Sequence, residues 1–411
     1  MSSRYSKRGI VILCSIVYFV SYFSRKDFAA VMAAMLSEGV LEKQAAGLIG
    51  TMLFIFYGIG QLLSGYLGDR ISPQYLIFLG VGTTAVCNLV MPLVPAGAMI
   101  PLWGLNGLAQ AMLWPPIVRI LSDHLDHEQF VSANLIVTTA AHVATILLYL
   151  YVPLCLRVMS WHAVFYSAAI LAGVTLAVFA LCLHLVLPKE TPSRADGARA
   201  TKAAPVTPLA SAVRSSGLFP IFGCIVMCGF LRDGIETWLP TLYSEAFHRD
   251  ASESILVSVA LPIFSILAIT LITALHRRRL FNHEVRGAAL LFATALVFAV
   301  PLYLLIETES PLSRTVCLVL ATLICAAMHG VNFLLISCLP GRFAQLGRAS
   351  TVSGLCNSCI YIGAAASTYG IALVAESLGW AATILSWIGV AAIGAVLAIP
   401  AYRRYSSFIR K

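Results

Sequence analysis

The stretch Tyr18-Phe-Val-Ser-Tyr22-Phe-Ser-Arg25-Lys26-Asp27-Phe28 places charged residues inside an apolar segment that runs from about Gly9 to Leu36. A segment of this length and composition matches a helix that crosses the hydrocarbon core of a bilayer. A charge near the middle of a bilayer is costly, and it is kept mainly where it faces a bundle interior or an aqueous path. The stretch therefore predicts a membrane-spanning helix, and Arg25 is a candidate site residue.

A second arginine stands in a similar setting half a chain later, in Cys228-Gly-Phe-Leu-Arg232-Asp-Gly-Ile-Glu236. Ser-Glu follows each arginine at the same offsets, as Ser37-Glu38 and as Ser244-Glu245. This agreement indicates a weak internal symmetry between the two parts of the chain.

The composition of the whole chain predicts a polytopic membrane protein. Of its 411 residues, 59% are hydrophobic and only 11% are charged, which leaves too little polar surface to cover a soluble globule. Long apolar runs without a ten-residue alternating pattern favour helices over a barrel. The formal net charge is +9, but the basic residues cluster in short segments between the apolar runs, so we do not expect a nucleic-acid partner.

Twelve apolar segments predict an all-α membrane protein. The loops between consecutive spans lie alternately on the two sides of the membrane. Nearly all of their Lys and Arg residues then fall on one side, and the other side has only Lys43, Arg157, Arg249 and Arg314. By the positive-inside rule we expect both termini in the cytoplasm. The first segment is longer than a signal h-region, so we expect a retained helix. The predicted spans are residues 9–36, 45–68, 75–93, 98–121, 131–154, 162–187, 217–243, 252–275, 287–306, 313–338, 350–374 and 381–402.

Residues 188–214 form one long polar connection of linker composition. They divide the chain into an N-terminal six-helix half (1–187), a cytoplasmic linker (188–214) and a C-terminal six-helix half (215–411). Two halves of this kind resemble the plan of the major facilitator transporters, whose substrate site lies between the halves near the midplane. The alternative from composition alone is another helical membrane protein, such as a receptor or sensor.

The second span ends in Gly65-Tyr-Leu-Gly-Asp69-Arg70, which resembles the loop signature of the major facilitators. An Asp-Arg pair at a cytoplasmic helix end can lock against a neighbouring helix and release as the halves rock, so Asp69 and Arg70 are candidate gating residues. The alternative is a helix stop that carries positive-inside charge. The equivalent position of the second half, His276-Arg-Arg-Arg279, lacks the acid.

Several stretches together resemble the organophosphate:phosphate antiporter family. They are Tyr18 with Tyr22 and Arg25-Lys26-Asp27-Phe28, Asn106-Gly107-Leu-Ala-Gln110-Ala-Met-Leu-Trp114-Pro115-Pro116, Ala141-His142, Trp161-His162-Ala163, and Leu231-Arg232-Asp-Gly-Ile with Trp238-Leu-Pro240. The resemblance covers most of the chain and is stronger before residue 250 than after it.

The resemblance implies a phosphate-binding site between the halves. Arg25 and Arg232 would hold the phosphoryl group, with His142 beside them and Tyr18, Tyr22 and Tyr361 lining the pocket. Arginine suits this role because its guanidinium is a rigid fork that stays charged, and histidine can gain a proton as a dianion arrives. The alternatives are structural ion pairs of the arginines with Asp27, Asp233 or Glu236, an interhelical hydrogen bond of His142, and packing roles for the tyrosines.

The chain departs from the family pattern at Gln61, at His329 and in the eighth helix, where an acid is replaced within Pro262-Ile263-Phe264, and Glu236 adds a charge near Arg232. Gln61 stands where the family often has a lysine, and His329 stands where a tyrosine is expected. Glu236 lies one helical turn after Arg232 on nearly the same face, so it is a candidate to bind an amine of the substrate, restrain Arg232 or carry a proton. We therefore include Gln61, His329 and Glu236 among the substrate-binding residues, and we expect a pocket less positive than usual for the family.

We predict a secondary transporter that exchanges an organic phosphate ester or similar small organic anion for inorganic phosphate by alternating access, and not an enzyme. We expect a monomer in a bacterial inner membrane, without a cofactor. No metal site is expected, because the eleven cysteines are scattered in apolar spans. Transport is expected to be secondary, because no Walker-type loop for ATP hydrolysis occurs. The alternatives are a transporter-like sugar-phosphate sensor and a proton-coupled organic anion symporter.

Overall fold

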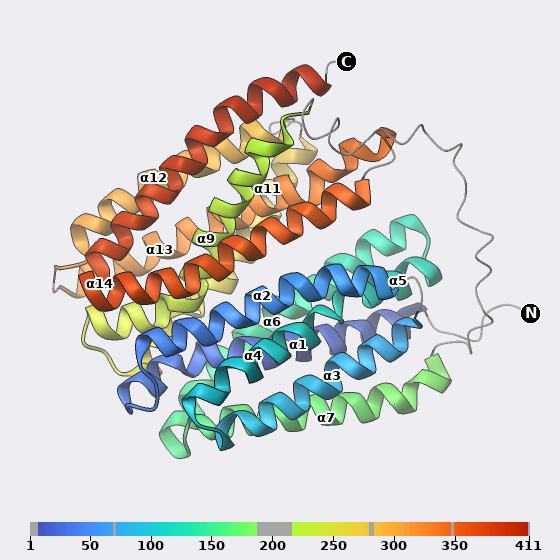
Figure 1. Cartoon of the computed structure of the whole chain (residues 1–411), viewed down its shortest axis with the longest axis horizontal. Coiled ribbons are helices and arrows are strands. Elements are labelled where there is room, and N and C mark those ends of the chain that lie inside the picture. The colour runs from blue at the N-terminus through green and yellow to red at the C-terminus, as the bar shows by residue number, and fades with distance from the viewer. Residues whose placement is uncertain are drawn as a thin grey trace, which may run out of the picture.

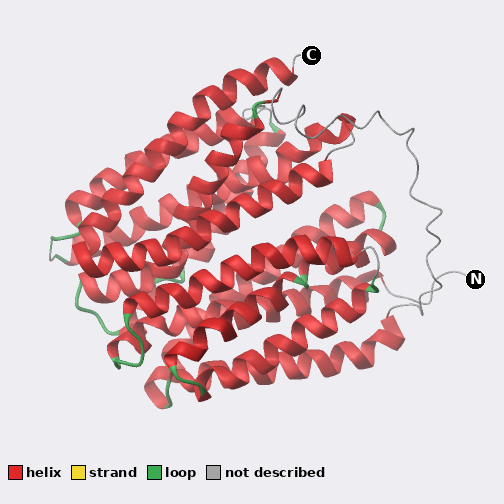
Figure 2. Ribbon diagram, in the orientation of Figure 1, coloured by secondary structure: helices red, strands yellow, loops and turns green. Residues whose placement is uncertain are grey.

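The computed structural model describes residues 7–68, 71–186, 216–278, 283–308, 310–346 and 349–409, and all regular elements in these ranges are helical (Figure 2). The helices lie in two groups side by side (Figure 1). The N-terminal group consists of α1 (Lys7–Ser37), α2 (Lys43–Gly68), α3 (Pro73–Val90), the 3-10 helix η1 (Met91–Leu93), α4 (Ala96–Ala111), α5 (Trp114–His124), α6 (His127–Val158) and α7 (Trp161–Val186). The C-terminal group consists of α9 (Leu218–Ala246), α10 (Ala251–Val257), α11 (Ala260–Arg277), α12 (Glu284–Leu305), α13 (Pro311–Asn332), the π-helical η2 (Phe333–Cys338), the 3-10 helix η3 (Leu339–Leu346) and α14 (Ala349–Ile409).

The all-helical membrane fold predicted from the sequence is confirmed. Within the described ranges, ten helices are long and apolar enough to cross a membrane. This number is below the twelve predicted spans because α4 and α5 are each too short to be counted and because the two segments of α14 are counted together. The span at 98–121 is divided into α4 and α5, because Pro115 and Pro116 provide no N–H for the preceding turn and instead begin a new helix. The spans at 350–374 and 381–402 both lie within α14, but Gly379 between them is non-helical, with φ 81° and ψ −179°, so α14 consists of two helical segments that match the two predicted spans.

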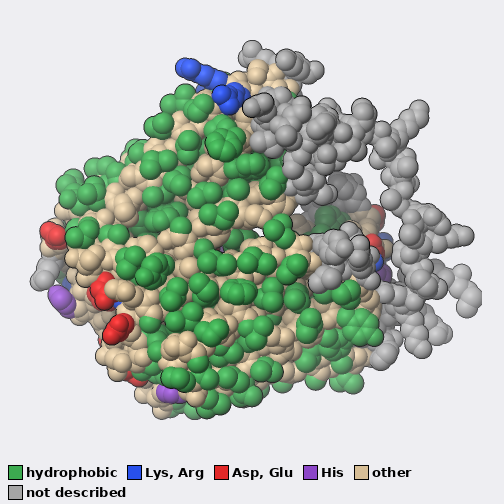
Figure 3. Space-filling view, in the orientation of Figure 1, with side chains coloured by type: hydrophobic (Ala, Val, Ile, Leu, Met, Phe, Trp, Pro, Cys, Tyr) green, Lys and Arg blue, Asp and Glu red, His purple; other side chains and the backbone are tan. Residues whose placement is uncertain are grey.

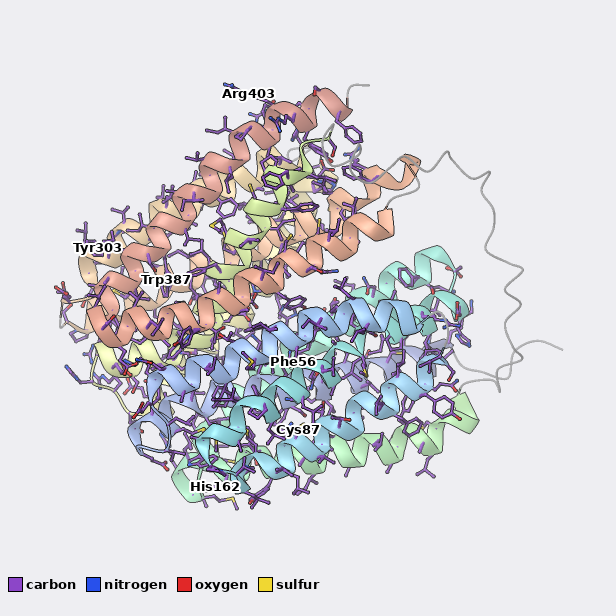
Figure 4. All side chains as sticks on the ribbon, viewed as in Figure 1. Phe56, Cys87, His162, Tyr303, Trp387 and Arg403 are labelled. Atoms are coloured by element: carbon purple, nitrogen blue, oxygen red, sulfur yellow. The ribbon has the colours of Figure 1, made fainter. Side chains whose placement is uncertain are left out.

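The outside of the bundle has the polarity of a membrane protein. Large apolar side chains are exposed along its flanks, and in Figure 3 the hydrophobic side chains cover the sides while charged ones gather toward the ends. Figure 4 places His162 and Arg403 at opposite ends of the bundle. A surface of this kind faces hydrocarbon along its sides and water at its ends. The protein is therefore a multi-pass membrane protein.

The two groups meet closely at one end of the bundle and diverge toward the other (Figure 1). We call the end at which α1 leads into α2 the distal end, and the end at which α1 begins and α14 finishes the terminal end. Toward the distal end, the Thr51 hydroxyl of α2 donates to the Ala365 carbonyl of α14 at 2.9 Å. Gly50 lies so near Thr368 that an added Cβ would be 2.4 Å from its Cγ2. The two groups are therefore in direct contact toward the distal end, and their helices diverge toward the terminal end (Figure 1).

Two sequence predictions lie outside the described residues. Asp69 and Arg70, the predicted gating pair, are not in the described ranges, and neither is the predicted linker at 188–214.

Candidate functional site

Charged side chains meet between the two groups at the middle of the bundle. Arg25 and Lys26 lie in the middle third of α1, and Arg232 lies at the midpoint of α9. An unbroken helix can place charges at this depth because its backbone bonds are satisfied within the segment, leaving the side chains to find partners across the bundle.

Arg25 packs against aromatic rings. Its guanidinium carbon lies 4.2 Å from the ring centroid of Tyr22 and 5.0 Å from that of Tyr57, which is cation–π geometry. Among the described residues its Nε has no hydrogen-bond partner and no carboxylate pairs with the guanidinium. Asp27 accepts a bond from the Phe28 backbone N–H at 2.8 Å instead. The predicted alternative of an Arg25–Asp27 ion pair is therefore absent from the described part of the chain.

Arg232 has partners for both ends of its guanidinium. Nη2 donates to Asp233 Oδ2 at 2.7 Å, and Nη1 donates to the Asn332 side-chain oxygen on α13 at 2.7 Å. The ion pair that the sequence analysis kept as an alternative is thus formed. Asn332 also fixes the direction of the fork, because it holds one nitrogen from a second helix.

Glu236 is the central residue of a polar network that connects the two groups. Its Oε2 accepts from Lys26 Nζ of α1 at 2.5 Å, and its Oε1 lies 2.7 Å from His329 Nε2 of α13. The side chains of Lys26, Glu236 and His329 are only 13%, 17% and 11% exposed, so these contacts are shielded from bulk water. Lys26 therefore neutralises a carboxylate of the other group across the interface.

His142 comes to the same place from α6. Its Nδ1 lies 3.0 Å from the Thr138 carbonyl oxygen, and its ring centroid is 6.2 Å from that of His329. The structure thus brings together three candidates that the sequence singled out on separate helices: Glu236, His329 and His142.

The predicted tyrosines lie around Arg25 to different degrees. Tyr22 contacts it directly, and Tyr18 is buried behind Tyr22 and Trp114, with ring centroids 5.1 and 4.7 Å away. Tyr361 of α14 reaches across the groups to Tyr57, at a centroid distance of 4.6 Å. Tyr18 and Tyr361 therefore support the rings that hold Arg25.

Gln61 forms its hydrogen bond with the end of α4 and not with the central charged residues. Its Nε2 donates to the Ala111 carbonyl at 3.3 Å, at the point where α4 ends. That carbonyl is near the helix break before Pro115, so the amide satisfies an acceptor freed there.

Several members of the site were not among the predicted residues. Lys26 is adjacent to Arg25 in the quoted motif, and Asp233 is adjacent to Arg232, so both had a signal in the sequence. Tyr57, Asn332 and Cys325 lie on other helices in apolar surroundings. Only the packing of these helices identifies them.

Two groups of spanning helices with buried charges paired between them are typical of a membrane transporter fold. The chain matches the Major Facilitator Superfamily over residues 14–368. It belongs to this superfamily.

Curated relatives are similar in sequence to this chain over part or most of its length. A probable hexose phosphate transport protein of Chlamydia trachomatis serovar D is 32% identical over 123 residues, which cover 29% of this chain and 26% of that protein. The membrane sensor protein UhpC of Escherichia coli (strain K12) is 32% identical over 120 residues, 29% of this chain and 27% of the sensor. The glycerol-3-phosphate transporter of Bacillus subtilis (strain 168) is 24% identical over 407 residues, 92% of this chain and 89% of that transporter. The match thus spans about a quarter of the first two proteins, and these relatives agree with the resemblance to the organophosphate:phosphate antiporter family.

Solved structures agree on the fold. A bacterial homologue of the human lysosomal transporter Spinster, in an inward-facing and unoccupied conformation, has a TM-score of 0.78 at 13% identity over 99% of both chains. The nucleoside transporter NupG has a TM-score of 0.71 at 16% identity over 96% of this chain and 99% of that one.

Proposed function

We propose that this protein is a secondary transporter that exchanges a small organic phosphate ester, or a similar compact organic anion, for inorganic phosphate by alternating access. The observation that carries the proposal is that Arg25 and Arg232 each lie near the middle of a spanning helix, one in each group, and that Lys26 beside Arg25 pairs with Glu236, one turn after Arg232. The names of the hexose phosphate and glycerol-3-phosphate relatives support the phosphate ester as substrate.

The charges at the centre favour a substrate with one net negative charge. Asp233 pairs with Arg232, and Glu236 pairs with Lys26. Arg25 is then the cation without a carboxylate partner among the described residues. A monoanionic phosphoryl group, or a dianion with a compensating amine, balances this charge without breaking either pair, and an unbalanced charge in a shielded site is costly.

The division into halves at 1–187 and 215–411 completes the proposal. The two groups of helices would rock about the central site, with the linker and both termini in the cytoplasm and Asp69 and Arg70 as a gate at that face. In this orientation the terminal end faces the cytoplasm of a bacterial inner membrane.

Transport by the purified protein tests the proposal. Liposomes loaded with inorganic phosphate should take up labelled phosphate ester, and liposomes without internal phosphate should take up little. Uptake that needs a proton gradient but no internal phosphate would instead establish a symporter.

A sensor is the second candidate, because UhpC shares a 120-residue segment at 32% identity. A sensor would bind the ester in a thermal-shift assay and give almost no flux in the phosphate-loaded liposomes. Binding together with exchange of ester for phosphate contradicts it.

A further inference from the structure

Three side chains of metal-binding type converge where α9 meets α13. The ligand atoms of Glu236, Cys325 and His329 all lie within 4.8 Å of one another. Cys325 and His329 are one turn apart on α13, so both face α9. The Cys325 thiol also lies 3.8 Å from the Arg232 carbonyl oxygen, so it is directed at the turn of α9 that carries Glu236.

The distances are close to those of a zinc site. Zinc binds nitrogen and oxygen at about 2.0 Å and sulfur at about 2.3 Å in a tetrahedron, which separates the ligand atoms by roughly 3.3 to 3.8 Å. Glu236 Oε1 lies 3.9 Å from Cys325 Sγ and 2.7 Å from His329 Nε2. One distance is slightly long and the other slightly short, so side-chain shifts on the order of 1 Å create the geometry.

A fourth ligand is available from the N-terminal group. The Thr138 carbonyl can only accept a bond, so its contact with His142 Nδ1 requires the Nδ1–H form, which in the neutral ring leaves the Nε2 lone pair free for a metal. Two imidazoles on one tetrahedral zinc have ring centroids about 5 Å apart. The centroids of His142 and His329 are 6.2 Å apart, so a small approach of α6 completes the set.

The surroundings also suit a metal. Lys26 holds Glu236 through Oε2, which leaves Oε1 directed at Cys325 and His329 and orients the carboxylate as an outer-shell partner does. Cys325 is buried, and the side chains of His329 and Glu236 are 11% and 17% exposed, so two of the three ligands remain accessible to an ion.

We propose that Glu236, Cys325 and His329 of the C-terminal group, together with His142 of the N-terminal group, bind a zinc ion or a similar borderline transition metal. Binding releases the Cys325 thiol proton to solvent, because the thiolate is the ligand. A metal held by helices of both groups ties them together at the centre, so it blocks exchange. The site does not depend on which anion the protein carries.

Cobalt(II) bound to the purified, tag-free, full-length protein tests the site. The wild type should bind one Co²⁺ with the intense visible bands of tetrahedral coordination and a thiolate charge-transfer band, and Zn²⁺ should displace both. Cys325→Ser should remove the charge-transfer band, whereas Cys317→Ser, two turns away on the same helix and also buried, should retain it.

The fourth ligand is tested by zinc affinity. His142→Gln should weaken Zn²⁺ binding at least tenfold. A wild type without a tetrahedral cobalt spectrum, or a charge-transfer band that persists in Cys325→Ser, would overturn the proposal. Unchanged zinc affinity in His142→Gln would overturn the link between the groups. The wild-type spectrum alone can refute the proposal, so the test remains decisive even if a variant fails to fold. Phosphate exchange is not part of this assay, so its outcome is independent of the proposed function.

Discussion

Arg25 and Arg232 present their guanidinium groups in different surroundings. Arg25 lies over two aromatic rings without a carboxylate partner among the described residues, whereas Arg232 is bonded to Asp233 and Asn332. An incoming anion meets the full attraction of an unpaired guanidinium, but it competes with the existing carboxylate at a paired one. At the scale of single residues, we therefore expect Arg25 to be the stronger anion-binding group.

Conservative replacement of the two arginines should reveal this difference. We expect Arg25→Lys to weaken binding of a phosphate monoester by about 10- to 100-fold, because a lysine loses the bidentate fork and the stacking on Tyr22. Arg232→Lys should cost less, and Arg249→Lys at the distal end should cost nothing measurable. Isothermal titration of the purified variants measures the three affinities. Equal losses for the two central arginines would show that Asp233 releases Arg232 on binding.

The Lys26–Glu236 pair should set which charge state of a substrate is preferred. Glu236→Gln leaves Lys26 without its carboxylate, so the site becomes more positive and should shift toward dianionic esters such as glycerol 3-phosphate. Loss of one partner of a desolvated pair is typically worth about 2 to 5 kcal/mol, enough to reorder substrates. Competition binding with phosphate esters, aminophosphonates and phosphate gives the rank order.

Two comparisons make the charge test specific. Lys26→Gln should shift the rank order in the opposite direction, toward less negative compounds. Glu253→Gln, which removes a carboxylate paired with Arg249 at the distal end, should leave it unchanged. The same order in wild type and Glu236→Gln would mean that Glu236 does not sense the ligand's charge.

At the scale of elements, glycines set how closely α9 packs against α14. A Cβ added at Gly229 of α9 would lie 2.1 Å from the Ile360 carbonyl oxygen, and one added at Gly363 of α14 would lie 2.0 Å from the Val226 carbonyl oxygen. Backbones that approach this closely gain dispersion contacts where lipid supplies no hydrophobic drive. The same packing places Tyr361 toward the N-terminal group and Arg232 toward the interior.

Alanine at this contact should destabilise the protein. We expect Gly363→Ala to lower stability by roughly 1 to 3 kcal/mol, because the added methyl group pushes backbone away from backbone. Gly354→Ala is the matched control on the same helix, since a Cβ there meets no atom within 4 Å and alanine favours a helix. Thermal unfolding in detergent measures both variants. A control that destabilises as much as Gly363→Ala would refute the packing argument.

At the scale of the whole molecule, the distal end is held closed by a contact between the groups. Lys43 at the start of α2 pairs with Glu245 near the end of α9 at 2.7 Å, and the Trp380 indole N–H donates to the same carboxylate oxygen at 2.9 Å. Lys43 also lies 5.5 Å from the Trp380 ring centroid. An alternating-access cycle has to break this contact each time the distal end opens.

Weakening that contact should shift the conformational equilibrium. The pair is partly exposed, with side-chain exposures of 16% and 36%, so we expect its loss to be worth about 1 kcal/mol, or roughly a fivefold shift toward distal opening. Spin labels on unnatural amino acids at positions 38 and 252, which line one distal pocket from the two groups, report the distance between the groups at this end. Lys43→Gln should enlarge the long-distance population, whereas Arg249→Gln, whose partner Glu253 is in its own group, should not. An unchanged distribution in Lys43→Gln would assign closure to the α2–α14 packing instead.

The sequence alone determined the helical membrane class, the approximate spans and the presence of charge at mid-depth. These follow from local physics, because an apolar run of the right length has to satisfy its own backbone bonds in hydrocarbon, and a charge inside it has to face inward. It also indicated a weak internal symmetry between the stretches around Arg25 and Arg232. The interruption at Gly379 falls between the predicted spans at 350–374 and 381–402, whereas the break before Pro115 carried a local signal that hydropathy alone does not register.

Only the tertiary structure decided how the central charges are paired. Lys26 and Glu236 are separated by 210 residues, and Arg232 and Asn332 by 100. Which side chains meet depends on the rotation and relative shift of helices from both groups, and these are set by close backbone contacts such as Gly363 with Val226. A sequence shows that a buried charge needs a partner, but the packing of the helices selects that partner, leaving Arg25 against aromatic rings and placing Glu236 between Lys26 and His329.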